Sequence, residues 1–140
     1  MAPQHRSDTI SPVTSFGASM PVWVDEEVAA LGHGPVGDGQ EARTVLMRLL
    51  NRLADRNMRE GGGGPFAALV RDPASGEIVT AGVNRVLASG LSSMHAEVTT
   101  LSLAQARRGT WDLGAAGAAP LELWVNARPC VMCYGATMWS

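Results

Sequence analysis

The two cysteines of this chain, Cys130 and Cys133, stand three positions apart in the stretch NARPCVMC. Such a pair could serve as a redox dithiol, as a structural metal clip, or as part of a catalytic metal site. Pro129 is typical of a first helical turn, and residues at i and i+3 lie on one side of a helix, so both sulfurs could reach one ion. The amide groups of a helix N-terminus also favour the thiolate forms that metals bind.

His95, in the sequence MHAEV, is the third candidate ligand, and we expect it in the first turn of another helix. Two thiolates and a neutral imidazole suit tetrahedral zinc and cancel its charge. A structural zinc site fills all four positions with protein atoms, and the other histidines, His5 and His33, belong to the N-terminal tail. The three ligands therefore predict a catalytic zinc site with one position left for water.

Glu97 follows His95 by two residues and could supply the acid–base group of a hydrolytic reaction. A carboxylate beside the ion can take a proton from water and deliver it to the ring and exocyclic nitrogens of an amidine-like substrate. The pattern H-x-E with P-C-x-x-C is the signature of zinc-dependent nucleobase deaminases. The combination predicts hydrolytic deamination, with a redox pair or a purely structural zinc clip as the alternatives.

Hydrophobic periodicity predicts the elements that position these residues. Residues 40–60 have apolar side chains at three- and four-residue spacing, which indicates an amphipathic helix. A second face of this helix carries four arginines, interpreted as a solvated surface offset by two acids, with an RNA-binding stripe as the alternative. The arginines are Arg48, Arg52, Arg56 and Arg59, and the acids are Asp55 and Glu60.

Residues 65–72 and 77–84 are expected to form a β-hairpin through the turn PASG. A helix over 94–108 capped by Ser92 or Ser93, a strand over 120–127 and a helix from Pro129 follow. Strands separated by a helix imply a parallel pair with a right-handed crossover, so the predicted fold class is α/β, a sheet covered by helices.

Composition is that of one globular domain: 140 residues, 46% hydrophobic and 17% charged. Residues 1–39, rich in Pro, Gly, Ser and Thr, are predicted to be a flexible N-terminal arm with one short helix near 24–31, and residues 40–140 the catalytic domain. The net charge of -2, without any lysine, gives no field that favours nucleic acid or a membrane surface. No long apolar run or secretory signal is present, so we expect a cytoplasmic protein.

The stretches GGPFAALV, VNRVLASGLSSMHAEV and NARPCVMCYGATMWS resemble the cytidine deaminase superfamily, and most of all its bacterial guanine deaminase branch. The resemblance covers about residues 62–140. It implies a three-layer α/β/α sandwich around a central mixed sheet, and a homodimer in which domain swapping is an option. It also implies hydrolysis of a small-molecule nucleobase, guanine to xanthine and ammonia, with zinc as the cofactor.

The resemblance further implies roles for individual residues. The zinc ligands would be His95, Cys130 and Cys133, the proton shuttle would be Glu97, and the substrate-binding residues would be Asn84, Phe66, Ala96 and Trp139. From the residues alone, the Asn84 amide offers a donor and an acceptor to a purine edge but could equally belong to a turn. Likewise, Phe66 and Trp139 would ordinarily be read as core aromatics.

Arg128 departs from the family pattern, because the guanine and transfer RNA branches commonly have an acid before Pro-Cys. We hypothesise that Arg128 either turns outward or reshapes the pocket edge for another aminated ring, such as isoguanine, an aminotriazine, 5-azacytosine or cytosine. The sequence also stops at Ser140, within a predicted helix, so the C-terminal strands of the relatives are expected to lie outside it.

Two other functions stay open beside free-base deamination. A transfer RNA adenosine deaminase shares both motifs but needs a basic track for the RNA backbone. A catalytically silent zinc-binding module would keep the ligands but would not need Glu97.

Overall fold

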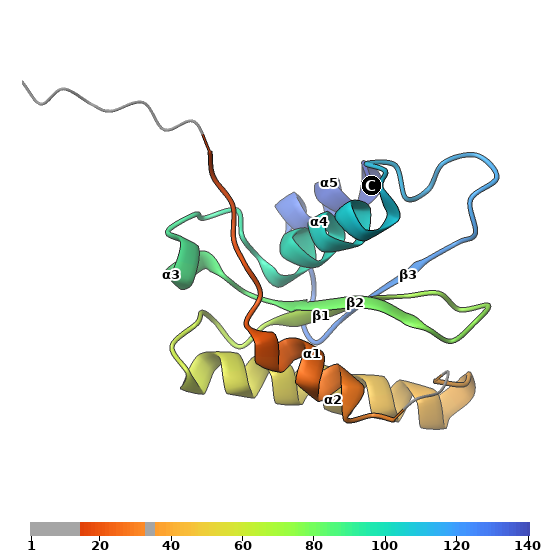
Figure 1. Ribbon diagram of the computed structural model, residues 1–140, viewed down its shortest axis with the longest axis horizontal. Helices are drawn as coiled ribbons and strands as arrows, with labels where there is room; N and C mark the ends of the chain where they lie inside the picture. The colour runs from red at the N-terminus through yellow and green to blue at the C-terminus, as the bar shows by residue number, and fades with distance from the viewer. Residues whose placement is uncertain (1–14, 33–35) are drawn as a thin grey trace, which may run out of the picture.

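The computed structural model describes residues 15–32 and 36–140 and has the predicted order of short helix, long helix, hairpin, helix, strand and helix, with one additional short helix, α3 (Figure 1). The elements are α1 (Val22–Ala29), α2 (Gly39–Arg59), β1 (Ala67–Arg71), β2 (Ile78–Val83), α3 (Val86–Ser89), α4 (Ala96–Arg108), β3 (Glu122–Val125) and α5 (Val131–Met138). The α/β class is confirmed. Among the described residues, none of the helices is both long and apolar enough to cross a membrane.

The sheet has the strand order β2-β1-β3, and β1 is antiparallel to both neighbours. The predicted parallel pair is therefore wrong for adjacent strands in the described chain, and the expected mixed sheet is not seen there. The physical reason is that the hairpin occupies one edge of β1 and leaves its other edge to accept β3. Although β2 and β3 run in the same direction, β1 lies between them. Consequently the start of β1 meets the ends of β2 and β3, with Ala67 opposite Val83 and Ala68 opposite Val125.

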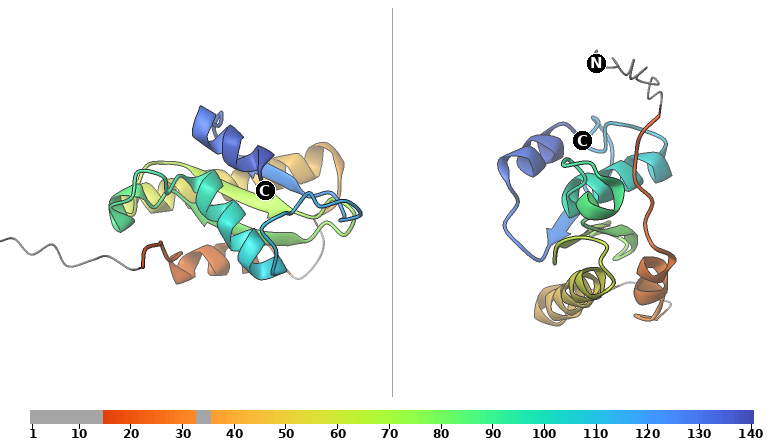
Figure 2. Two further views of the ribbon diagram at one scale, coloured as in Figure 1. Left: turned by 90° about the horizontal axis from the view of Figure 1, so that it is seen from above. Right: turned by 90° about the vertical axis from the view of Figure 1, so that its left-hand side faces the viewer.

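Helices cover both faces of the sheet: α1 and α2 lie on one side, and α4 and α5 lie on the other (Figures 1 and 2). Every residue of β1 is buried because this central strand has a helical layer on each face. Leu69 packs into the cluster on the α1 and α2 side, whereas Val70 packs against Leu101 of α4. The two faces thus have separate hydrophobic clusters joined through β1.

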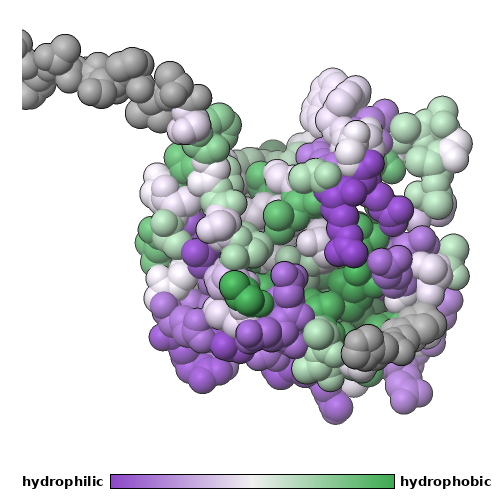
Figure 3. Space-filling view, in the orientation of Figure 1, coloured by the Kyte–Doolittle hydropathy of each residue, from purple (hydrophilic) through white to green (hydrophobic). Residues whose placement is uncertain are grey.

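The long helix α2 buries the predicted apolar stripe and exposes its charged face. Arg59 pairs with Asp55 at 2.7 Å and Arg56 pairs with Glu60 at 2.8 Å, as expected for a solvated surface offset by acids. Arg56 and Arg52 also reach Glu27, at 3.1 and 3.4 Å. Polar side chains dominate the part of the surface over α1 and α2, and apolar ones show between the two helical layers (Figure 3).

Helix α1 lies within the predicted flexible arm but packs on the core. Its Trp23 and Val24 are 8% and 1% exposed, and the guanidinium of Arg56 lies 4.8 Å from the centre of the Trp23 ring. Residues 22–29 therefore belong to the globular unit, because they cover the sheet face that α2 leaves open. Residues 1–14 and 33–35, which include His5 and His33, lie outside the described part.

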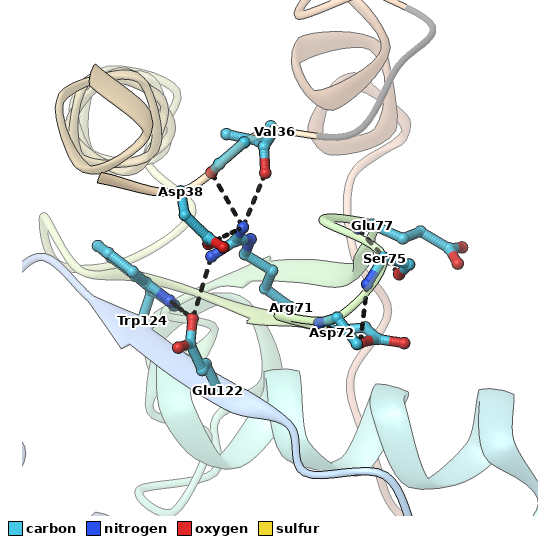
Figure 4. A network of polar contacts seen from close by, with 10 residues as sticks. Val36, Asp38, Arg71, Asp72, Ser75, Glu77, Glu122 and Trp124 are labelled. Atoms are coloured by element: carbon cyan, nitrogen blue, oxygen red, sulfur yellow. Dashed lines mark hydrogen bonds and ion pairs between the residues drawn. The ribbon is translucent and has the colours of Figure 1, made fainter. Parts of the chain in front are cut away.

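Arg71 joins the segment before α2 to the sheet (Figure 4). This side chain is only 3% exposed and pairs with Asp38 at 2.8 Å and with Glu122 at 3.3 Å. Its guanidinium also donates to the carbonyl oxygens of Val36 at 2.7 Å and Gly37 at 3.0 Å. Since Arg71 ends β1, this network fixes one end of the sheet and leaves the other end to the functional groups.

Candidate metal centre and active site

The candidate site lies at the end of the sheet where β1 begins and where β2 and β3 finish. Phe66 precedes β1, Asn84 follows β2, and Asn126 follows β3. The Asn126 side chain joins the strands there, since its Oδ1 accepts from the Ala67 N–H at 2.9 Å and its Nδ2 donates to the Pro65 carbonyl at 3.1 Å. The antiparallel pairing on both sides of β1 thus brings segments that are distant in the sequence to the same end of the sheet.

The three predicted metal ligands meet at this edge. His95 is the N-cap residue of α4, Cys130 is the N-cap residue of α5, and Cys133 lies in the first turn of α5. The His95 Nδ1 atom is 3.7 Å from the Cys130 Sγ and 3.6 Å from the Cys133 Sγ, and the two sulfurs are 3.6 Å apart. The predicted Ser92 or Ser93 cap does not occur, because His95 itself occupies the cap position.

The ligand spacing fits a tetrahedral zinc ion. Zinc bonds of about 2.3 Å to sulfur and 2.0–2.1 Å to nitrogen give ligand–ligand distances of about 3.6–3.8 Å. Among the described residues, the cluster contains His95, Cys130 and Cys133 and no fourth His, Cys, Asp or Glu. Both cysteines are free thiols, and the imidazole is as near to each sulfur as the sulfurs are to each other. This arrangement favours a metal centre over a redox dithiol.

The two thiols differ in environment. Burial, followed by the Cys130 side chain and the Glu97 carboxylate, raises the pKa of the Cys133 thiol to about 12. The backbone N–H of Cys133, followed by its side chain, lowers the pKa of the exposed Cys130 thiol. Because a cation stabilises both thiolates, zinc binding would offset the free-energy cost of burying the charged Cys133 thiolate.

Glu97 is the second residue of α4 and lies next to the ligand cluster. The residue is 8% exposed, and its carboxylate is close enough to raise the pKa of the Cys133 thiol. The N-terminal turn of a helix stabilises a carboxylate through its aligned amide groups. A largely buried acid that is not needed as a ligand is thereby held beside the metal position.

A cavity of about 160 Å³ opens over these groups. It is lined by Phe66, Asn84, His95, Glu97, Ala127, Arg128 and Cys130. A larger cavity of about 360 Å³ lies between α4, β3 and the end of α5, but its wall is mainly aliphatic and carries none of the predicted catalytic groups. The smaller cavity is therefore the candidate active site.

Two of the four predicted substrate-binding residues line this cavity, and two do not. Phe66 and Asn84 line the cavity, and so does Arg128, in line with the hypothesis that it shapes the pocket edge. Ala96 is buried as the first residue of α4 but is not part of the lining. Trp139 follows α5 as its C-cap residue, is 80% exposed and lies outside the lining of this cavity, so its substrate contact stays a prediction.

Asn84 has a fixed orientation. Its Oδ1 accepts from the N–H groups of Gly64 at 3.4 Å and Val86 at 3.2 Å. Because an N–H group needs an acceptor, these contacts identify the oxygen and leave the Nδ2 donors for a ligand. The sequence suggested that the amide offers a donor and an acceptor, whereas the structure commits the acceptor to the backbone.

Asn57 and Gly63 support Asn84, and sequence reasoning missed both. Asn57 is fully buried in α2, and its Nδ2 donates to the carbonyl oxygens of Asn84 at 2.9 Å and Gly64 at 3.1 Å. A Cβ atom on Gly63 would lie 2.5 Å from the Asn84 carbonyl oxygen. The available signal was position, because Asn57 follows Leu53 by four residues and continues the apolar stripe of α2.

Comparison with known proteins agrees with this geometry. Residues 40–140 match the family described as the cytidine and deoxycytidylate deaminase zinc-binding region, and the chain belongs to this family. The His95, Cys130 and Cys133 cluster lies within the matched region, as does Glu97.

Individual relatives include two classes of deaminase. The chain is 37% identical over 98 residues to a guanine deaminase of Bacillus subtilis, covering 69% of this chain and 57% of that protein. It is 31% identical over 96 residues to a tRNA-specific adenosine deaminase of Streptococcus pyogenes, covering 69% of this chain and 55% of that protein. The chain thus spans little more than half the length of these curated relatives.

A solved guanine deaminase from Nitrosomonas europaea has the same fold. The two structures superpose with a TM-score of 0.74 at 38% sequence identity, over 92% of this chain and 67% of that one. The expected resemblance to the guanine deaminase branch is confirmed.

Proposed function

We propose that this chain carries the site of a zinc-dependent aminohydrolase that acts on a free nucleobase, with guanine as the first candidate. The reaction adds water to guanine and yields xanthine and ammonia. The observation that carries the proposal is the buried Glu97 carboxylate beside a three-ligand cluster that borders a cavity. The guanine deaminases among the relatives support the choice of ring.

Zinc held by His95, Cys130 and Cys133 would act as a Lewis acid that lowers the pKa of a water molecule at the cavity. Glu97 would accept the proton that this water loses and pass it to the substrate nitrogens, so that the amine leaves as ammonia. Asn84 would donate a hydrogen bond to the ring through Nδ2, and Phe66 would contact the ring as a wall of the cavity.

The size of the cavity supports a free base as the substrate. At about 160 Å³ it is smaller than the roughly 300–1,000 Å³ of sites for drug-sized ligands, which suits a single purine or pyrimidine. Related rings with an amine, including isoguanine, aminotriazines, 5-azacytosine and cytosine, remain in the substrate class.

A transfer RNA adenosine deaminase is the second candidate, since one relative has that activity. RNA binding needs a basic surface, and the arginine face of α2 is the candidate for it. However, Arg52, Arg56 and Arg59 of this face are paired with Glu27, Glu60 and Asp55. This pairing offsets three of the four arginines and leaves Arg48 as the one without an ion pair among the described residues, which supports the small substrate.

A homodimer is also proposed from the family resemblance. The α5 face exposes large apolar side chains, which would suit an interface between two copies: Val131 at 89%, Met138 at 84% and Trp139 at 80% exposure. Sedimentation of the zinc-loaded protein tests this, and a monomer at all concentrations would contradict it.

Replacement of Glu97 tests the proposed reaction. Zinc-loaded Glu97→Gln should retain its metal but release ammonia from guanine about 10²- to 10⁴-fold more slowly, because the amide cannot shuttle the proton. Glu41→Gln, an exposed position in the first turn of α2, is the matched control. Full activity in Glu97→Gln would overturn the mechanism. If the wild type deaminated transfer RNA but no free base, the second candidate function would be favoured instead.

A further inference from the structure

Arg128 is the cationic side chain in the wall of the candidate active site. It lies in the short connection between the end of β3 and the start of α5, two residues before the ligand Cys130. Because a strand and a helix flank this connection, its backbone position is restricted. Within residues 15–32 and 36–140, Arg128 forms neither an ion pair nor a side-chain hydrogen bond. Arg128 is exposed at the wall of the cavity, so its guanidinium is available to a ligand that binds there.

Asn84 and Arg128 offer the same kind of group to that ligand. The Asn84 oxygen is used by the N–H groups of Gly64 and Val86, which leaves only the Nδ2 donors. A guanidinium has five N–H donors and no acceptor. Apart from the metal ligands and Glu97, the polar side chains that line the cavity are these two donors.

This donor set distinguishes between rings. An asparagine that reads adenine uses its oxygen and its nitrogen together, which Asn84 cannot do. Arginine instead pairs with a carbonyl oxygen and a neighbouring unprotonated ring nitrogen, as with O6 and N7 of guanine. Because the amine that leaves must face Glu97 and the ligand cluster, another edge of the ring faces the remaining wall.

We propose that Arg128 is a specificity-determining residue that selects aminated rings with a carbonyl acceptor on the edge away from the reacting amine. The inference rests on the proposed function and narrows its substrate class to oxo-purines and related lactam rings. A ring without that oxygen leaves the Arg128 donors unsatisfied, and a site built around hydrogen bonds discriminates strongly against such an analogue.

The test compares guanine with 2-aminopurine, which keeps the 2-amino group and lacks the 6-oxygen. The ratio of kcat/KM for the two bases is measured in the wild type and in Arg128→Met, which removes the donors and keeps an unbranched side chain. The expected result is a fall of roughly 10- to 100-fold in the preference for guanine. Arg43→Met, an exposed arginine of α2 outside the cavity wall, is the matched control and should retain the wild-type ratio.

An equal loss on both bases, or an unchanged ratio, would overturn the inference while deamination itself continued. Arg128→Gln is the second variant and should shift the ratio in the same direction. Zinc content and thermal midpoint are measured for each variant, so that a folding defect is recognised.

Equilibrium binding separates this inference from the proposed function. Dissociation constants for guanine and 2-aminopurine are measured on zinc-loaded Glu97→Gln with and without Arg128→Met. Preference for guanine that depends on Arg128, in a protein whose wild type deaminates neither base, would sustain the inference and refute the proposed function. Equal binding of the two bases would refute the inference whatever the turnover.

Discussion

The Nδ1 atom of His95 lies 3.6 Å from the Sγ of Cys133, although the two residues are 38 positions apart in the chain. This contact joins the N-terminal ends of α4 and α5, which pack side by side over the sheet. The contact depends on β1 lying between β2 and β3, because with that order β2 and β3 finish at the same end of the sheet, where α4 and α5 begin.

Zinc content should depend on each ligand separately. We expect about one zinc ion per chain, and loss of that ion in His95→Ala and in Cys133→Ser, because a tetrahedral site with two protein ligands holds zinc far more weakly. Metal analysis after dialysis measures this. Met132→Leu, between the two cysteines, is the control and should retain zinc, whereas full zinc in Cys133→Ser would contradict the assigned ligand set.

Asn57 should stabilise the backbone at Gly64 and Asn84, beside the site. Asn57→Ala removes the donor to two carbonyl oxygens, and we expect a loss of about 1–3 kcal/mol in the free energy of unfolding. Urea denaturation measures the loss. Asn51→Ala, exposed on the same helix, should change stability by no more than about 0.5 kcal/mol. Equal effects of the two substitutions would show that the buried amide is not a support for Asn84.

Gly82 should set the distance between β2 and α4. A Cβ atom at this position would lie 2.5 Å from the Thr100 Oγ1, so Gly82→Ala must displace the Thr100 side chain or the helix that carries it together with Glu97. We expect a loss of about 1–3 kcal/mol in unfolding free energy and weaker zinc binding. The contrasting variant is Gly135→Ala in α5, where the added methyl meets open space, and a gain of about 0.5–1 kcal/mol is expected. A stable Gly82→Ala with normal zinc affinity would contradict this packing.

The hairpin turn should make stability depend on pH through Asp72. The backbone N–H groups of Ser75 and Ala74 hold the pKa of the Asp72 carboxyl below its usual range. A pKa that is lower in the folded state than in the unfolded state stabilises the protein above the unfolded value of about 3.9 and ceases to do so as pH falls through the folded value. The stability difference between wild type and Asp72→Asn should therefore shrink as the pH is lowered from 6 to 3. Urea denaturation curves measure it, and a constant difference over that range would exclude Asp72 as the titrating group.

The chemistry of the site could be predicted from sequence because it depends on short local patterns. The spacing of Cys130 and Cys133 and the H-x-E pattern of His95 and Glu97 each lie at the start of one helix, so local geometry already restricts them. The ligand chemistry of zinc predicted that His95 and the two cysteines meet, the family resemblance implied the same, and the distances confirm it.

Other features depend on contacts between distant segments. The order of β1 relative to β3 is decided by which edge of the hairpin remains open, and no local pattern encodes that. The packing of Trp23 on the core follows from the uncovered sheet face beside α2, although the surrounding sequence is typical of a loose arm. Asparagine is usually a surface residue. Asn57 is buried because the glycine-rich segment Gly61–Gly64 folds back toward Asn84, so that its amide donates to the carbonyl oxygens of Gly64 and Asn84.

The antiparallel arrangement around β1 sends all the reactive groups to one end of the sheet and leaves the Arg71 end free of them. The hairpin turn at 72–77 and the connection at 109–121 both leave from that opposite end. A reporter peptide or a fluorophore attached to either connection would therefore lie far from the metal ligands and Glu97. These loops are suitable attachment points for immobilising or imaging the protein.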